Sequence, residues 1–96
     1  MALQRVKLAL TTSIIIGDAR RLEEGKKPLR TIWGLAQELE RINPELYEAN
    51  KTSNKLRRLE RTGQERIDRY LIADLTHVLH VTYDELHDVD LGTVNH

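Results

Sequence analysis

Residues 66 to 80 carry apolar side chains at the three- and four-residue spacing that places them on one side of a helix. The apolar positions are Ile67, Leu71, Ile72, Leu75, Val78 and Leu79. A helix with so wide an apolar face is stable where other elements cover that face. The segment therefore predicts a helix that is part of a packed helical core.

A second apolar stripe predicts a helix from Leu29 to Arg41, with Ile32, Leu35, Ala36 and Leu39 on its inner side. The pair Asn43-Pro44 ends this helix, because Pro disfavours helical geometry in the residue before it. The same pair can begin a short new helix, with Asn43 as its N-cap and Pro44 at its first position. That short helix would end near Asn50.

Two more helices are predicted on either side of the 66–80 segment. Thr52 or Ser53 can cap the first of them, and Gly63 ends it. Thr82 can cap the second, which is a single last turn. Leu56 and Leu59 form the inward edge of the first, and the second contains Tyr83 and Leu86.

The first thirty residues fit more than one structure. A helical stripe joins Leu3, Val6 and Leu10, whereas the alternation of a strand joins Val6, Leu8 and Leu10. The run from 11 to 16 favours extended structure by propensity. We expect a helix near 14–24 that ends at Gly25, and an N-terminal strand or arm over residues 1–13.

The composition excludes several classes of protein. Ninety-six residues suit one small domain, and without Cys there are no disulfides, thiol nucleophiles or thiolate metal sites. The longest apolar run, Ile14 to Ile16, is too short to span a bilayer. These features predict a cytoplasmic protein that does not interact with membranes.

The formal net charge of zero is unevenly distributed along the chain. Residues 1–30 hold seven Lys/Arg and three Asp/Glu, and residues 51–69 hold the same numbers, so each block has a charge of +4. Residues 31–50 have a charge of −3 and residues 70–96 a charge of −5. Because binding depends on the local charge, the basic blocks are compatible with a polyanionic partner.

Two stretches of sequence carry a family resemblance: TSNKLRRLERTG, from residue 52, and LIADLTHVLHVTYDEL, from residue 71. Together they resemble the helix-turn-helix DNA-binding domain of phage repressors and Cro, the XRE-type family. The matching residues of the first stretch are Thr52, Leu56, Leu59 and Glu60, and Gly63 lies one residue after the position at which the family has its glycine. Those of the second are Leu75, Val78, Leu79, Val81, Thr82 and Leu86, with His80 where the family has Gly.

The first helix of the motif can be aligned in two ways. LAQEL, residues 35–39, resembles it, but twelve residues then separate it from the recognition helix, where the family has about four. In the alternative, residues 43–50 are the first motif helix, which restores a short turn but puts Glu45 and Leu46 where a leucine and an alanine are expected. We favour the first alignment, with an inserted turn of helix led by Pro44.

The resemblance implies an all-α, lambda-repressor-like bundle of about five helices, with residues 14–88 as the DNA-binding domain and 89–96 as a polar tail. It implies a sequence-specific double-stranded DNA-binding regulator that reads the major groove with residues 52–61. Ser53, Asn54, Arg57 and Arg58 would face the bases, and Lys51, Lys55 and Arg61 the phosphates. The candidate DNA-binding residues are Lys51, Thr52, Ser53, Asn54, Lys55, Arg57, Arg58 and Arg61.

A homodimer is expected, because one recognition helix contacts few base pairs and discrimination needs two half-sites. Two apolar segments can form the dimer contact. One contains Val81, Tyr83, Leu86, Val89 and Leu91, and the other contains Val6, Leu8, Leu10 and Ile14 to Ile16.

Other functions are also compatible with the sequence. The basic faces could instead dock an acidic protein partner, which makes a helical protein–protein interaction module the alternative. His77, His80 and His87 lack a strong metal-ligand spacing, so we expect neither a metal nor a cofactor. No nucleophile or phosphate loop accompanies the paired acids, so we expect no enzyme. Glu60 is expected to hold a neighbouring helix end or an arginine.

Overall fold

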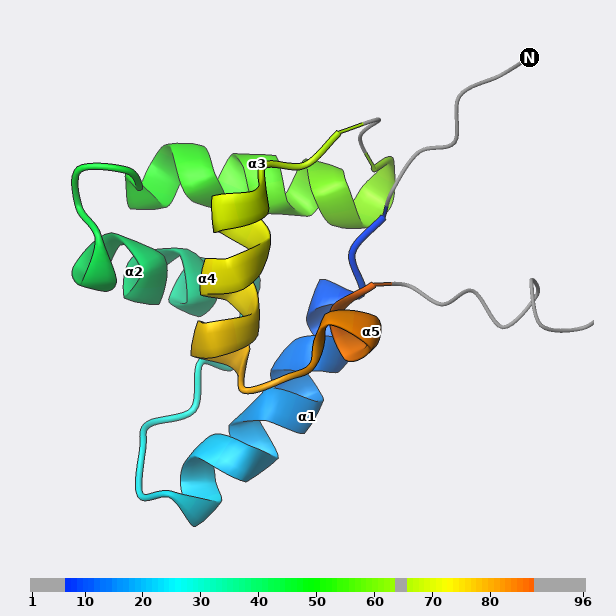
Figure 1. Cartoon of the computed structure of the whole chain (residues 1–96). Helices are drawn as coiled ribbons and strands as arrows, with labels where there is room; N and C mark the ends of the chain where they lie inside the picture. The colour runs from blue at the N-terminus through cyan, green and yellow to red at the C-terminus, as the bar shows by residue number, and fades with distance from the viewer. Residues whose placement is uncertain (1–6, 64–65, 88–96) are drawn as a thin grey trace, which may run out of the picture.

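The computed structural model describes residues 7–63 and 66–87, which form an all-α bundle (Figure 1). Five helices occur in this part of the chain: α1 (Leu10–Glu23), α2 (Ile32–Ile42), α3 (Ala49–Arg61), α4 (Arg69–Leu79) and α5 (Tyr83–Leu86). Leu8 and His87 form one isolated antiparallel bridge. The predicted fold class, a small bundle of about five helices, is therefore confirmed.

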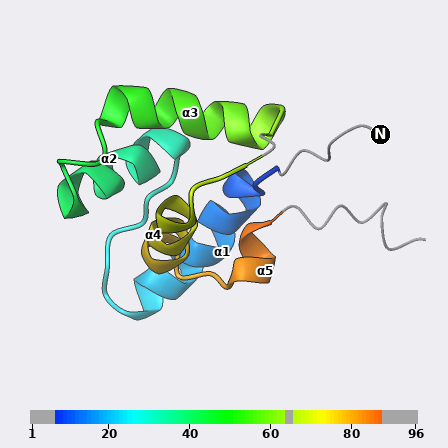
Figure 2. The same cartoon turned by 45° about the horizontal axis from the view of Figure 1, so that its top comes forward.

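α2 contacts the other three long helices and connects the two sides of the bundle. After the turn at residues 43–48, α3 runs back beside α2 along one side of the molecule (Figures 1 and 2). α1 and α5 lie on the other side, against α4. The core between them is aliphatic, with fully buried leucines from every helix: Leu10, Leu35, Leu39, Leu56, Leu59, Leu71, Leu75, Leu79 and Leu86.

α2 begins at Ile32 and not at the predicted Leu29, because Thr31 is its N-cap and accepts a hydrogen bond from the Gly34 N–H at 3.0 Å. Other predicted helix ends are confirmed by their caps. Thr82 caps α5 in a capping box with Glu85. Gly25 and Gly63 both have φ +77 and follow the ends of α1 and α3, where the left-handed conformation favours glycine.

The predicted helix over Asn43–Asn50 is wrong. Residues 43–48 form a turn, and α3 begins at Ala49, three residues before the predicted cap. The buried Ala49 extends the inner stripe of α3 back by one turn, and its N–H donates to the Glu40 carboxylate of α2 at 3.3 Å. These tertiary contacts outweigh the local Asn43-Pro44 signal, and they also exclude the alignment that placed the first motif helix at 43–50.

α1 also begins earlier than predicted, at Leu10 in place of residue 14, so residues 10–13 belong to the helical domain. Burial explains the difference: Leu10 and Ile14 are in the core, and this outweighs the extended propensity of the β-branched run. The expected N-terminal strand is reduced, among the described residues, to the bridge at Leu8. Residues 1–6 and the predicted tail at 89–96 lie outside the described residues.

Five of the eight described apolar residues that we assigned to a dimer contact are instead in the core. Val81 and Leu86 are buried in the C-terminal segment, and Leu8, Leu10 and Ile14 are buried in the N-terminal one. Tyr83 and Ile15 are exposed by 62% and 68%. Val6, Val89 and Leu91 lie outside the described residues. Of the two segments, Tyr83 and Ile15 are therefore the residues most accessible to a partner chain.

α1 approaches the C-terminal end of α4 very closely. A methyl group placed on Gly17 would overlap the carbonyl of Leu79, so only glycine fits at this point. Next to it, Arg21 Nη1 donates to the Val78 carbonyl at 3.0 Å and Arg20 Nη1 donates to the His80 carbonyl at 2.8 Å. The last carbonyls of α4, which have no partner within the helix, are thus satisfied by α1.

Arg20 also fixes α5. Its two terminal nitrogens donate to the two carboxylate oxygens of Glu85, each at 2.8 Å. Glu85 in turn accepts from the Thr82 backbone N–H at 2.9 Å. Hydrogen bonds from Arg20 first, and then from Thr82, lower the pKa of Glu85 to about 2. The carboxylate form of Glu85 is therefore the form that the fold stabilises.

Gly17→Ala should destabilise the fold by at least about 1–3 kcal/mol, because the added methyl group forces α1 away from the α4 backbone. In an open helix position the same change is stabilising by about 1 kcal/mol, so the sign is diagnostic. Urea unfolding followed by circular dichroism measures it. Ala19→Ser on the exposed side of α1 is the control and should change stability by less than about 0.5 kcal/mol.

Acid should weaken the fold through Glu85. Its pKa is about 2 in the fold and 4.5 as the ordinary value, so the carboxylate stabilises the fold above pH 4.5, and this stabilisation is lost as the pH falls from 4.5 towards 2. Glu85→Gln can retain the cap but not the charge, so its urea midpoint should fall less steeply than that of the unmodified chain over this interval. Parallel curves for the two proteins would show that the Arg20–Glu85 pair contributes nothing to acid sensitivity.

Candidate nucleic-acid interface

α3 has one buried side and one open side. Its inner residues are Ala49, Thr52, Ser53, Leu56 and Leu59, all buried. The helix lies along the edge of the molecule, covered by α2 on its inner side (Figure 1). Its outer side is thus accessible over the full 13 residues, which corresponds to a length of about 20 Å.

The structure divides the eight predicted DNA-binding residues into two groups. Lys51, Asn54, Arg57, Arg58 and Arg61 are exposed on the outer side, and Lys55 is partly exposed. Thr52 and Ser53 are only 7% and 3% exposed, so their assignment to the interface is wrong. Because the helix begins at Ala49, both fall on the inner side, where the Ser53 hydroxyl donates to the Asn50 carbonyl at 3.0 Å.

The exposed residues of α3 form two parallel rows. The spacing of a helix aligns residues 50, 54, 57 and 61, which are Asn, Asn, Arg and Arg. A second row beside it contains residues 51, 55 and 58, which are Lys, Lys and Arg. Asn50 was missed in the sequence because it was assigned to the end of a preceding helix. The apolar Ala49, which lies three residues before Thr52 and is buried in the structure, was the signal in the sequence that could have assigned Asn50 to this helix.

Glu60 is the single acidic residue of α3, and it is turned towards α1. Its Oε2 accepts a hydrogen bond from the Thr11 N–H at 2.6 Å, in the first turn of α1. An acid at this point also interacts favourably with the positive end of the helix dipole. The expectation that Glu60 holds a neighbouring helix end is confirmed, and the outer rows of α3 contain no acid.

Acids flank the row of lysines at both edges. Lys51 Nζ lies 3.6 Å from the Glu48 carboxylate, at the start of α3, and Lys55 Nζ lies 3.8 Å from that of Asp68, before α4. Both are surface ion pairs, which contribute little to stability. They do lower the positive charge near the first turns of α3. The last turns, with Arg57, Arg58 and Arg61, are the more strongly cationic half.

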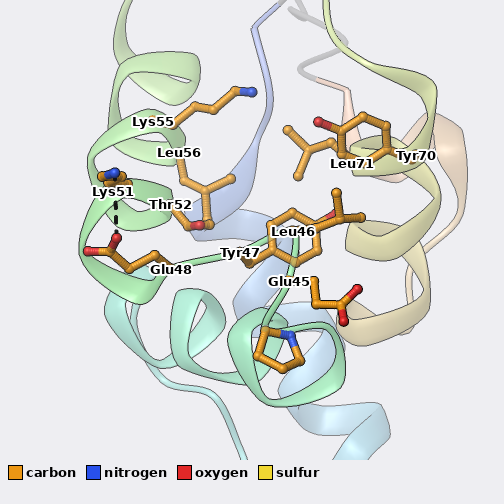
Figure 3. A pocket seen from close by; sticks show the side chains of 11 residues that line it. Glu45, Leu46, Tyr47, Glu48, Lys51, Thr52, Lys55, Leu56, Tyr70 and Leu71 are labelled. Atoms are coloured by element: carbon orange, nitrogen blue, oxygen red, sulfur yellow. Dashed lines mark ion pairs between the residues drawn. The ribbon is translucent and has the colours of Figure 1, made fainter.

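A pocket of about 400 Å³ lies beside this lysine row, between the 43–48 turn, α3 and α4 (Figure 3). Leu56 and Leu71 are buried in its wall, and Lys51 and Glu48 lie at one edge. Tyr47 is buried here and donates to the Asp74 carboxylate of α4 at 2.5 Å. Burial, and then this hydrogen bond, raise the pKa of Tyr47. Tyr47 thus ties the turn before α3 to α4.

The connection between α2 and α3 differs from that of the helix-turn-helix motif, which has a turn of about 3–4 residues. Here the turn comprises residues 43–48 and contains Pro44 and the buried Tyr47. α3 then runs back beside α2 (Figures 1 and 2). The helix predicted by LAQEL is present as part of α2, but its connection to α3 is longer than in the motif.

Within residues 7–63 and 66–87, no helix is long and apolar enough to cross a membrane. In the same part of the chain, no three His, Asp or Glu side chains come close enough together to hold a metal ion.

No family model, curated protein or solved structure matches the chain. The function proposed below therefore depends on the geometry and the charges of α3.

Proposed function

We propose that this chain is a cytoplasmic transcriptional regulator that binds double-stranded DNA through the outer side of α3. The observation that carries the proposal is the pair of rows on that side, which combine amides, lysines and arginines without an acid. A single helix fits the major groove of B-DNA, which is about 12 Å wide. Asn pairs with adenine and Arg with guanine on the base edges, so α3 carries the residue types for reading sequence.

The two rows suggest how the contacts are divided. Asn50, Asn54, Arg57 and Arg61 share one exposed row of α3, and we assign them to base edges. Lys51, Lys55 and Arg58 lie at the side of this row, and we assign them to phosphates, which set affinity and register. Relative to the sequence expectation, Arg58 and Arg61 exchange roles and Asn50 replaces Ser53.

Selection of bound sites from random duplex DNA tests the proposal directly. A regulator of the repressor, Cro or antitoxin kind should enrich one sequence, with affinity that falls as salt rises. If no duplex is enriched and an acidic protein is retained through nuclease treatment and high salt, the chain is an interaction module instead. Absence of any enriched sequence is enough to reject sequence-specific binding.

Substitutions in the two rows should have different effects. Asn54→Ala and Arg57→Ala should each cost about 1–3 kcal/mol on the selected site and relax the sequence preference. Lys51→Ala should weaken all duplexes alike and lower the salt slope by about 1. Fluorescence anisotropy with selected and scrambled duplexes measures both. Arg30→Gln, a charge change in the loop between α1 and α2, is the control and should alter neither.

The proposed regulator is a homodimer, because two half-sites are needed for discrimination. A groove of about 710 Å³ along α4 supplies the contact, with Ile72, Ala73 and Thr76 on one side and Val81 and Tyr83 on the other. Arg69 lies at the first turn of α4 and Asp84 follows Tyr83 in α5. Two copies packed antiparallel about a two-fold axis through this groove would bring Arg69 of each towards Asp84 of the other.

Sedimentation equilibrium should give a species of twice the 11.1 kDa of the chain. Ala73→Arg should shift it to the monomer, since a charged side chain at this exposed position fills the groove. Ala19→Arg, on the outer side of α1, is the matched control and should leave the dimer intact. A dimer that is lost only with Ala19→Arg would place the contact elsewhere. A monomer at all concentrations would show that the chain does not form this dimer.

A further inference from the structure

Arg21 is a buried cation whose hydrogen-bond partners are carbonyl groups. The residue is 7% exposed, its Nε donates to the Lys27 carbonyl at 2.8 Å, and its Nη1 donates to the Val78 carbonyl at 3.0 Å. Within the described residues, no carboxylate forms an ion pair with it. The end of the α4 dipole offsets part of this charge, but buried arginines ordinarily have an acid partner.

A pocket of about 360 Å³ opens beside Arg21, between the loop after α1 and the C-terminal ends of α2 and α4. Basic and imidazole side chains dominate its lining: Arg21, Lys26, Lys27, Arg41, His77 and His80. Glu38 is the single acid that lines it. α3 contributes no residue, so the pocket is separate from the proposed DNA interface.

The acids near the pocket are already paired. Glu38 binds the Arg41 guanidinium through both oxygens, and the hydrogen bond from Arg41 is the main cause of its lowered pKa. Glu24 lies 3.3 Å from both Lys26 Nζ and His80 Nδ1. Arg21 and the exposed Lys27 are left, among the described residues, without a carboxylate partner. The pocket thus has an excess of two positive charges.

We infer that this pocket binds a small molecule through a phosphate group, held by Arg21 and Lys27 with His77 beside them. A guanidinium and an ammonium are the donors that proteins use for phosphate, and the bonds are charge-assisted. The pocket volume lies in the range of about 300–1,000 Å³ that is usual for small-ligand sites, which leaves room for a body attached to the phosphate. The site adds a ligand to the protein beyond its proposed binding of DNA.

NMR titration of the ¹⁵N-labelled chain at constant ionic strength tests the inference, with inorganic phosphate and glycerol 3-phosphate as the two probes. Saturable shifts are expected at residues 26–28, 41–42 and 77–80. Tighter binding of glycerol 3-phosphate would identify a phosphate ester as the ligand class, and equal binding would identify the free anion. Sodium chloride at the same ionic strength should shift none of these amides.

Lys27→Gln should weaken phosphate binding about tenfold, because it removes one of the two unpaired cations and leaves the backbone carbonyl that holds Arg21. His77→Gln tests the third side chain and should also weaken it. Lys51→Gln on α3 removes a cation outside the pocket and should have no effect. The inference is overturned if the pocket amides show no saturable shift, if α3 responds with equal affinity, or if Lys27→Gln binds as tightly as the unmodified chain.

Discussion

The contact between α1 and the C-terminal end of α4 is the constraint on which the rest of the structure depends. Gly17 lets the two backbones meet, and Arg20 and Arg21 donate to carbonyls at the end of α4. Asp18, in the same turn of α1, accepts hydrogen bonds from the Leu29 and Arg30 N–H groups at 2.7 and 2.8 Å and so fixes the loop that leads to α2. α2 packs on both α1 and α4, and α3 packs on α2. The position of α3 therefore depends on four residues of α1: Gly17, Asp18, Arg20 and Arg21.

This contact also separates the cations that maintain the fold from those that face solvent. Arg20 and Arg21 belong to the first basic block of the sequence, yet one is paired with Glu85 and the other is buried against carbonyls. The cations of α3 have no such role, apart from the surface pairs of Lys51 and Lys55. The net charge of a stretch of sequence does not distinguish the two groups of cations. A guanidinium that binds carbonyls at a helix end adds the same charge to that sum as a guanidinium exposed to water.

The periodicity of apolar residues predicted the helices that are defined by their own apolar side chains. It failed where contacts between residues distant in the sequence determine where a helix begins. The helix predicted at 66–80 and the Thr82 cap follow from local spacing; the helix is present as α4, which spans the shorter Arg69–Leu79, and the cap begins α5. The start of α3 depends instead on contacts that form only on folding: Glu40 of α2 accepts from the Ala49 N–H, and Tyr47, just before α3, donates to Asp74 of α4. Taking Thr52 or Ser53 as the cap left both outside the regular helix; within α3 they lie four and three residues before Leu56 and so share its inner side. Asn50 was lost from the candidate interface for the same reason.

The long turn before α3 affects how the proposed complex forms. In the short-turn motif the first turns of the recognition helix reach the bases. Here Glu45 and Glu48 stand at the start of α3, where they repel phosphate, whereas Arg57, Arg58 and Arg61 lie at its other end. Leu8 bonds the Leu59 carbonyl at 3.3 Å, which brings the exposed Lys7 to this same end. Because α2 covers only the inner side of α3, the outer rows are open along their length. In the proposed complex the C-terminal half of α3 therefore determines the position of the duplex, and Asn50 and Asn54 read bases from the position that these arginines impose.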